Sequence, residues 1–334
     1  MIRVSFLEMQ ATLERVLISR GVQADRAALA SRLIAETSLD GVYTHGAHRF
    51  YPLIKQIDEG IVDPEATASL VSAHGALERW DGNSGIGNLN AYAMTERAIA
   101  LAKEHTIGVV ALKNTNHWMR PGTYGLMAAE AGCIGILWTN TMPLMAPWGS
   151  EETKVGNNPL VIALPTEEEG PFLVDMAMSL FSYGTLETHV REGKPLPEVG
   201  GWDSEGVLTT DAAAIMESRR SLPIGFWKGT SLAIALDLVA AALSGGNTTY
   251  DIGQLGVERT ASQVFITIDI SAFSDYAEIQ RRIGVSLADI EASEPLVAGD
   301  QVRWPGKRRA AVRAENLANG IPTSKKIWEK ILTL

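Results

Sequence analysis

The sequence predicts an α/β fold in which a sheet domain is joined to a helical unit built from both ends of the chain. Strand-like apolar runs alternate with helical segments through the middle of the chain, which is typical of an α/β domain. Both ends instead show apolar residues at helical spacing, with glycines where the helices stop. The predicted division is a helical domain over 1–75 with 305–334, and an α/β domain over 76–304.

Helices are predicted in both terminal segments. The first begins at Ser5, which has capping-box spacing with Glu8, and ends at Gly21. The third contains Pro52, which removes one backbone hydrogen bond and is expected to bend it. The predicted helical ranges are 5–21, 24–39, 45–59, 307–319 and 323–334.

The middle of the chain alternates between helices and strands. Helices are expected over 88–105, 122–131 and 229–243. Short runs rich in Val, Ile and Leu predict strands at 107–112, 134–139, 160–164, 172–174 and 264–268. The Gly- and Pro-rich segment 191–211 is expected to be a long loop, and a loop of that length inside a compact domain is often functional.

Composition and charge exclude several classes of protein. The chain has 334 residues, 46% of them hydrophobic, and a net charge of −10, so it can bury a large core but lacks a basic nucleic-acid footprint. Its longest apolar stretches, such as 231–243, are too short to span a bilayer. The N-terminal segment has the charge pattern of a mature helix and not of a signal peptide. We therefore expect a cytoplasmic protein with neither a nucleic-acid nor a membrane partner.

The segment 44–49, THGAHR, is the stretch most typical of an active site. If it is helical, His45 and Arg49 project from one face, because residues four apart are neighbours on a helix. An imidazole can give a proton to a ketone oxygen, and a guanidinium can hold a carboxylate through two hydrogen bonds, so the pair suits a 2-oxo acid. The alternatives are a solvated helix face and a metal site at His45 and His48, for which no third ligand completes a known spacing.

Polar residues that follow predicted strands form a second group of candidates. Ligands of α/β sheets bind beyond the carboxyl ends of strands, and Asn116 with His117 follows one strand while Asn140 follows the next. Asp175 ends a third strand, where an acid can accept hydrogen bonds from a ribose. Asn158 precedes a proline, which favours an extended backbone. Each of these residues could instead serve only a turn, a helix cap or an ion pair.

Nucleotide-binding patterns are weak in this chain. Lys228 and Gly229 open the apolar helix predicted over 229–243, and a helix N-terminus with a lysine suits an anion. The glycines at 85 and 87 lack a third glycine and a clear preceding strand, so neither a Rossmann fingerprint nor a P-loop is present. The single cysteine, Cys133, excludes internal disulfides and a multi-cysteine metal site.

Taken together, the motifs resemble the malate/L-lactate dehydrogenase family, whose nicotinamide-binding fold is not a Rossmann fold. The resemblance runs nearly end to end, and the motifs keep their order and spacing. They are VLISRG (16–21), GVYTHG (41–46), NHWMR (116–120), WTN (138–140), NPL (158–160), VDM (174–176), MSLFSYG (178–184), WKG (227–229) and AEN with NGI (314–321). The resemblance implies a non-Rossmann NAD(P)-binding mixed-sheet domain, and so a dehydrogenase without the glycine fingerprint.

The resemblance also assigns roles to residues. It implies that His45 is the proton donor for reduction and that Arg49 clamps the substrate carboxylate. The residues expected to contact the substrate are Thr44, Arg49, Asn116, His117 and Asn140. The residues expected to contact the cofactor are Pro171, Phe172, Leu173, Val174, Asp175, Met176, Ala177, Trp227, Lys228, Gly306, Lys307 and Arg308. Family members resemble one another in being dimers with the cofactor site near the subunit interface, so a homodimer is expected.

Four residues depart from the family pattern. Thr44 replaces the usual serine but keeps the hydroxyl. His48 stands where close relatives have asparagine, and this difference leaves the exact sugar substrate open. Lys307 and Arg308 stand where close relatives have histidine and glutamate. An acid near the adenosine ribose favours NAD, whereas basic residues suit a 2′-phosphate. The resemblance implies NADH as the cofactor, and the basic residues at 307 and 308 make NADPH the alternative.

The predicted function is the NAD(P)H-dependent reduction of the α-keto group of a 2-oxo sugar acid, without a metal. Free histidine has a pKa of about 6.5, so the His45 imidazolium is expected to be available near neutrality. Within the same family, the alternative substrates are malate- or lactate-type acids and cyclic imino acids. From a different class, the alternative is a non-catalytic sugar-acid binding protein.

Overall fold

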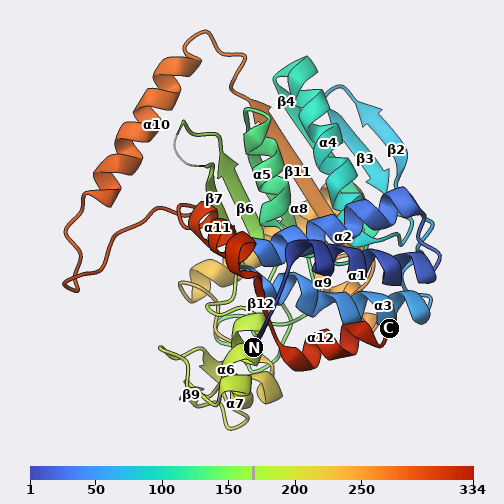
Figure 1. Ribbon diagram of the computed structural model, residues 1–334, viewed down its shortest axis with the longest axis vertical. Helices are drawn as coiled ribbons and strands as arrows, with labels where there is room; N and C mark the ends of the chain where they lie inside the picture. The colour runs from blue at the N-terminus through green and yellow to red at the C-terminus, as the bar shows by residue number, and fades with distance from the viewer. Residues whose placement is uncertain (168–169) are drawn as a thin grey trace.

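The computed structural model describes residues 1–167 and 170–334, and Figure 1 shows its α/β architecture. At its centre is a seven-stranded sheet in the order β2-β3-β4-β11-β5-β6-β7. β3 and β4 run parallel, whereas the other neighbouring pairs are antiparallel, so the predicted mixed sheet is confirmed. The strands are β2 (Ser69–His74), β3 (Leu77–Asp81), β4 (Ile107–Thr115), β5 (Cys133–Thr139), β6 (Leu160–Leu164), β7 (Phe172–Met176) and β11 (Ala261–Asp269).

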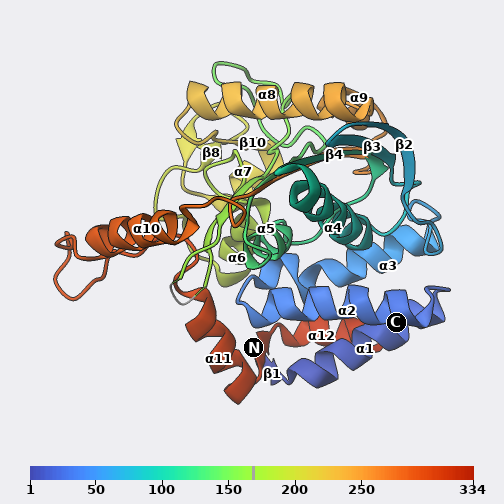
Figure 2. The same cartoon turned by 90° about the horizontal axis from the view of Figure 1, so that it is seen from above.

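Helices cover both faces of the sheet. Figure 2 shows α4 (Gly87–His105) and α5 (Gly122–Glu130) on one side and α8 (Trp227–Ser244) on the other. Neighbouring residues of β11 follow this division, because Phe265 packs into the core beneath α4 and α5 while Val264 packs into the core beneath α8. The strands that lead to the candidate site are therefore held from both faces.

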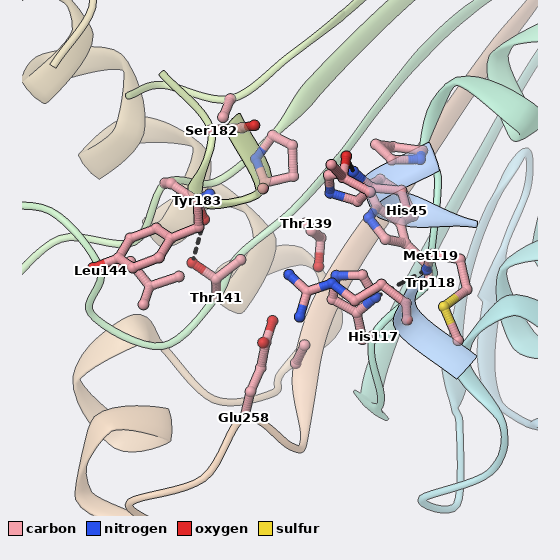
Figure 3. A pocket seen from close by; sticks show the side chains of 18 of the residues that line it. His45, His117, Trp118, Met119, Thr139, Thr141, Leu144, Ser182, Tyr183 and Glu258 are labelled. Atoms are coloured by element: carbon pink, nitrogen blue, oxygen red, sulfur yellow. Dashed lines mark hydrogen bonds between the residues drawn. The ribbon is translucent and has the colours of Figure 1, made fainter. Parts of the chain in front are cut away.

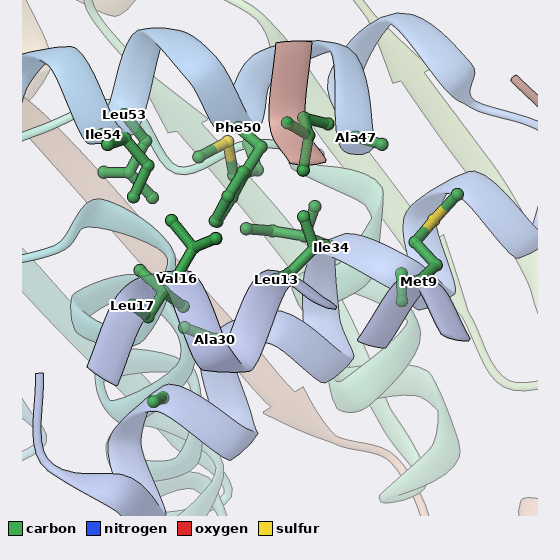
Figure 4. Close-up of a cluster of buried hydrophobic side chains, with 14 of the residues drawn as sticks. Met9, Leu13, Val16, Leu17, Ala30, Ile34, Ala47, Phe50, Leu53 and Ile54 are labelled. Atoms are coloured by element: carbon green, nitrogen blue, oxygen red, sulfur yellow. The ribbon is translucent and has the colours of Figure 1, made fainter. Parts of the chain in front are cut away.

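Both ends of the chain contribute to one helical layer. It contains α1 (Phe6–Ser19), α2 (Ala24–Leu39), α3 (Phe50–Asp58) and α12 (Lys325–Leu332). Figure 4 shows Leu13, Ile34 and Phe50 meeting in its core. The two chain ends also pair directly, because β1 (Ile2–Val4) is antiparallel to β12 (Ile321–Thr323). The division into two folding domains stays a prediction.

Several segments differ from the sequence-based expectation. β2 joins the sheet although it lies before residue 76, and its mostly exposed side chains explain why no apolar pattern marks it. The expected loop 191–211 begins inside a helix and contains two short strands, which form a separate small sheet with a third. The elements concerned are α6 (Tyr183–Glu192), β8 (Gly201–Trp202), β9 (Leu208–Thr209) and β10 (Arg220–Ser221).

Four further helices complete the described part of the chain. One of them, α10, stands away from the body of the molecule in both Figure 1 and Figure 2. Another, α11, follows the predicted cofactor segment near residue 306 and packs against α2. These helices are α7 (Ala212–Ser218), α9 (Thr249–Gln254), α10 (Tyr276–Glu291) and α11 (Arg309–Asn319).

Helix α8 is longer than the apolar stretch visible in the sequence. It has 18 residues and a mean hydropathy of 1.2, which is enough to cross a membrane by length and composition alone. The expectation that this stretch is too short is therefore wrong. Seven of its residues are buried against the sheet, and the core helix of a soluble protein passes the same test. The helix thus gives only weak evidence for a membrane span.

Candidate active site

A cavity of about 230 Å³ opens between the helical layer and the edge of the sheet where β4, β5 and β7 end. Figure 3 shows side chains from several elements converging on it, among them His45, His117 and Glu258. Position beyond the carboxyl ends of strands is where ligands of α/β sheets bind. The cavity brings together residues predicted to act on or contact the substrate and residues predicted to contact the cofactor. They are Thr44, His45, Arg49, Asn116, His117, Asn140, Asp175 and Ala177.

The segment that carries His45 and Arg49 is not one helix. It consists of two 3₁₀ turns, Tyr43–His45 and Ala47–Arg49, separated by Gly46. A Cβ atom at Gly46 would collide with the Ser38 hydroxyl, which itself accepts a hydrogen bond of 2.9 Å from the Ala47 backbone. Packing against α2 therefore breaks the predicted helix 45–59, and only its second half forms α3. Both side chains nevertheless reach the cavity.

His45 lies in an environment that disfavours its charged form. Its Nδ1 atom is 3.0 Å from the Thr44 hydroxyl, and its ring stacks on that of His117 with centroids 6.1 Å apart. Burial, together with the positive charges of Arg49 and Arg120, lowers the pKa of His45 to about 4. The expectation of a ready imidazolium near neutrality is therefore wrong for the protein without substrate.

His117 is held in one neutral tautomer. The Met119 backbone N–H donates a hydrogen bond of 3.1 Å to its Nδ1 atom, so the ring proton belongs on Nε2. Burial, and after it the charges of Arg49 and His45, keeps the pKa of His117 well below its usual value. His117 therefore presents an N–H donor and no positive charge.

Arg49 is the cation among the described residues that line the cavity. Its guanidinium has no hydrogen-bond or ion-pair partner within residues 1–167 and 170–334. Its charge acts on His45, on His117 and on Glu258. A half-buried guanidinium without a protein partner is suited to a carboxylate ligand, because its planar fork donates two parallel hydrogen bonds.

The asparagines are mostly committed to the protein itself. The Asn140 amide donates to Asp237 and to the Asn247 carbonyl at 2.8 and 2.7 Å and accepts from Ser262 N–H at 2.7 Å. Its side chain is thus fully engaged, and the geometry disfavours the predicted substrate contact. Asn116 donates to two backbone carbonyls, but its Oδ1 atom is buried without a partner in the described part of the chain.

Asn158 differs from its predicted conformation. Its φ is 21° and not extended. Its buried side chain accepts from the Thr141 N–H and donates to the Ala233 carbonyl, at 3.0 and 2.8 Å. These bonds tie the loop after β5 to α8 and compensate for the unusual backbone.

The predicted cofactor segment 171–177 contains β7, and the other two predicted segments approach its opposite ends. Leu173 N–H donates to the Pro305 carbonyl at 3.0 Å, which places the segment 306–308 beside β7. Ile224 N–H donates to the Met178 carbonyl at 2.9 Å, which brings the start of α8 to the other end. Gly306 has φ +101°, and a Cβ there would lie 2.7 Å from the Pro171 carbonyl, so the close approach needs glycine.

The basic residues of these segments are not equivalent. Lys307 pairs with Glu291 at 3.1 Å, and its Nζ lies 5.4 Å from the centroid of the Trp304 ring. Arg308 is exposed, and Trp227 and Lys228 are exposed at the first turn of α8. The acid that pairs with Lys307 comes from the end of α10, and no sequence pattern connected the two residues.

Sequence reasoning missed other residues that line the cavity. Ser182 and Tyr183 come from the start of α6, where Ser182 caps the helix through a bond of 3.1 Å from Thr185 N–H. Gly184 lies so close to Thr44 that a Cβ would be 2.6 Å from it. Glu258 comes from the segment between α9 and β11 and has no local signature. Only the MSLFSYG motif gave a signal for the first three residues.

Comparison with known proteins agrees with this geometry. The family model described as malate/L-lactate dehydrogenase matches residues 4–332. A curated relative from Escherichia coli, named 2,3-diketo-L-gulonate reductase, is 42% identical over 333 residues, which cover 99% of this chain and 100% of the relative.

Solved structures give the same result for the fold. Malate dehydrogenase from Entamoeba histolytica superimposes with a TM-score of 0.94 at 25% identity, covering 99% of this chain and 96% of that one. Sulfolactate dehydrogenase from Methanocaldococcus jannaschii superimposes with a TM-score of 0.89 at 28% identity, covering 99% and 95%.

Proposed function

This chain belongs to the malate/L-lactate dehydrogenase family, and we propose that it reduces 2,3-diketo-L-gulonate to 3-dehydro-L-gulonate. It is an oxidoreductase with a nicotinamide cofactor. The observation that supports the substrate class is the composition of the cavity. A histidine, an arginine with no partner among the described residues, and the end of the predicted cofactor segment meet in one space, which suits a ketone next to a carboxylate.

Arg49 and the two histidines divide the work of binding the substrate. Arg49 holds the carboxylate through its planar fork, which fixes the face of the ketone. His117 donates its Nε2 proton to a substrate oxygen, in agreement with its tautomer. His45 stacks beside it and serves the ketone oxygen. Thr44 orients the His45 ring through its hydroxyl, 3.0 Å from Nδ1.

Proton supply depends on the substrate. His45 is mostly neutral without a ligand, because its pKa is about 4. A bound carboxylate offsets the charge of Arg49, which raises the pKa of His45. Substrate binding is therefore accompanied by proton uptake, and His45 then gives the proton to the ketone oxygen as the hydroxyl forms.

The surface along β7, where the predicted cofactor segments gather, suits a dinucleotide. Gly306 packs closely on Pro171, and exposed Lys228 and Arg308, on the segments at either end of β7, suit phosphate groups. Bound there, a reduced nicotinamide supplies the hydride. Asp175 and Ala177 belong to the predicted cofactor segment and also line the cavity, so the nicotinamide end of the cofactor would lie near them.

The choice between NADH and NADPH rests on Arg308 more than on Lys307. Glu291 offsets the charge of Lys307 at 3.1 Å, whereas Arg308 makes no ion pair within the described residues. If the enzyme accepts NADPH, Arg308→Ala should lower kcat/KM for NADPH about tenfold, the loss of one charge-assisted hydrogen bond, and leave NADH within threefold. Lys307→Ala should change the ratio of kcat/KM for NADPH to kcat/KM for NADH less than Arg308→Ala does. A strong NADH preference that neither substitution alters would contradict a role for these residues in cofactor choice.

A substrate panel tests the proposed function. Oxidation of NADH and NADPH is followed at 340 nm with 2,3-diketo-L-gulonate, pyruvate, oxaloacetate and a cyclic imino acid. The proposal expects the sugar acid to give the highest kcat/KM. A higher value for another substrate would move the assignment to that sibling activity. Ligand binding without any absorbance change would indicate a non-catalytic binding protein.

We further propose a homodimer, supported by an apolar face on α8. Trp227, Leu232, Ile234, Leu238 and Val239 are exposed on this helix, and exposed apolar patches of this kind mark interaction sites. Leu238→Glu should therefore convert a dimer to a monomer, halving the mass measured by sedimentation. Val207→Glu, at an equally exposed valine in the β8–β9 turn, is the matched control. A wild-type monomer would contradict the proposal.

The cytoplasmic location expected from the sequence agrees with this reaction. Reduction of a sugar acid consumes a reduced nicotinamide from the metabolic pool, so we place the activity in carbohydrate catabolism inside the cell. Fractionation of cells that express the chain tests the location.

A further inference from the structure

Glu258 brings a carboxyl group into a cavity that otherwise suits anions. Figure 3 shows its side chain pointing into the cavity from the wall opposite His45. It also lines a smaller cavity next to the first, together with Arg49, Gln56 and His117. The charged residues among the described lining of the main cavity are Arg49, Asp175 and Glu258.

The segment that carries Glu258 is held in place. Gln56 of α3 donates to the Glu258 carbonyl at 3.3 Å. Two residues on, Thr260 adopts φ 57°, which is unusual for a β-branched residue. Its hydroxyl accepts a hydrogen bond of 2.9 Å from Asn247 and donates one of 2.6 Å to the Arg259 carbonyl. Such strain persists only where surrounding contacts fix it, so the position of Glu258 is specified by the fold.

With the ketone oxygen at His45 and the carboxylate at Arg49, one substituent of the substrate remains for the part of the lining that includes Glu258. The carbonyl carbon of a 2-oxo acid has three substituents, of which the oxygen is served by His45 and the carboxylate by Arg49. The third substituent, which is the rest of the substrate chain, would contact the remaining residues of the lining. Asp175 lies on the cofactor side, where its carboxylate accepts a hydrogen bond of 2.9 Å from Gly122 N–H. Glu258 is thus the charged residue of the described lining that remains for the third substituent.

On the basis of the proposed function, we infer that Glu258 is a specificity-determining residue that accepts hydrogen bonds from the hydroxyl groups of the substrate chain and rejects dicarboxylates. A carboxylate is an acceptor with about four lone-pair positions, which match neighbouring hydroxyls. One cation in the cavity balances one substrate carboxylate, so a second anionic group would meet Glu258 without compensation. Burial raises the pKa of the Glu258 carboxyl and the Arg49 charge opposes that rise.

The test compares three 2-oxo acids that differ only in what they place beyond the ketone. These are 2,3-diketo-L-gulonate with hydroxyls, pyruvate with a methyl group and oxaloacetate with a second carboxylate. The variant is Glu258→Gln, which keeps the shape and removes the charge. Its matched control is Glu294→Gln, at an exposed glutamate outside the cavity lining. Assays at about pH 8 keep carboxyl groups ionised, and thermal unfolding verifies that each variant is folded.

For Glu258→Gln we expect kcat/KM for the sugar acid to fall about tenfold, because a hydrogen bond to a charged acceptor is replaced by a neutral one. The value for oxaloacetate should rise about tenfold as the like charge is removed. Pyruvate should stay within threefold. Glu258→Asp, which keeps the charge, should retain the rejection of oxaloacetate.

Two results would overturn parts of this inference separately. If the ratio of oxaloacetate to pyruvate is the same in Glu258→Gln and in the wild type, Glu258 does not reject dicarboxylates. If the ratio of sugar acid to pyruvate is unchanged, it does not bind the hydroxyl groups. A wild-type enzyme that reduces pyruvate but no sugar acid would instead refute the proposed function, and the oxaloacetate comparison would still test Glu258.

Discussion

Replacing His45 with glutamine is expected to lower the turnover of 2-oxo acid reduction by about 10²–10⁴-fold, the usual contribution of a positioned general acid. Glutamine fills a similar volume and forms hydrogen bonds, but it cannot transfer a proton at neutral pH. Turnover is measured by NADH oxidation with the best substrate of the panel, and cofactor binding by fluorescence quenching. Binding should survive, because His45 lies outside the predicted cofactor segments.

His48→Gln is the matched control for this experiment. His48 belongs to the second 3₁₀ turn, but it does not line the cavity in the described part of the chain. The His48→Gln variant should therefore retain turnover within a few-fold of the wild type, even if the preferred sugar acid changes. Near-normal turnover in His45→Gln would contradict the assignment of the proton donor, whereas an equal loss in both variants would indicate a structural effect.

The depressed pKa of His45 gives the same assignment a second test. If His45 is the proton donor, reduction requires its protonated ring, and the pKa of about 4 means that this form becomes rarer as pH rises above that value. The kcat/KM for reduction should fall about tenfold per pH unit between pH 6 and 8, whereas oxidation, which needs the neutral ring, should be nearly flat. This decrease of kcat/KM with rising pH should be absent in the residual activity of His45→Gln.

Residue chemistry and motif order predicted several residues that line the candidate site, but not their environment. His45 and Arg49 are recognisable because their side chains suit a 2-oxo acid and because the surrounding motifs keep family spacing. The break at Gly46 depends on contact with Ser38 of another helix, which no local pattern records. The charge state of His45 depends in part on Arg120, which is 75 positions away and reaches it only in the fold.

The fold shows the same division between local and tertiary causes. Buried β5 is apolar on both sides, and β11 is apolar over Val264–Ile266, so their sequences predict these strands directly. The exposed strand β2 pairs through its backbone at the sheet edge and has no comparable pattern. Glu258 was missed for a related reason, because its role comes from the cavity it faces and not from its neighbours in the chain.

Asp40→Asn is expected to destabilise the protein by about 3–5 kcal/mol, because it leaves the buried Arg120 guanidinium without its counter-charge. The Asp40 carboxylate accepts from Arg120 and Arg313 at 2.7 and 2.8 Å and lies 3.4 Å from Arg309. The side chains of Asp40 and Arg120 are 4% and 6% exposed, so water cannot replace the lost partner. Denaturant unfolding measures the change.

Glu36→Gln provides the comparison for Asp40→Asn. Glu36 pairs with the same Arg313 at 3.7 Å, but both side chains are about one third exposed, so its loss should cost less than about 1 kcal/mol. If the two substitutions lowered the free energy of unfolding equally, burial of the ion pair would not explain the large effect expected for Asp40→Asn. The double variant Asp40→Leu with Arg120→Met should recover part of the loss, since removing both charges leaves no unpaired buried ion.

The ion pairs of Asp40 also connect stability to the chemistry of the site. Burial raises the pKa of Asp40, but Arg120 and Arg313 outweigh it and hold the pKa below its usual value. The stabilisation is therefore complete above about pH 4 and is lost as pH falls through the folded-state pKa. In Asp40→Asn the charge of Arg120 is no longer balanced, so the pKa of His45 should fall further and the kcat/KM for reduction at neutral pH should drop with it. An unchanged pH profile in a folded Asp40→Asn variant would show that Arg120 does not act on His45.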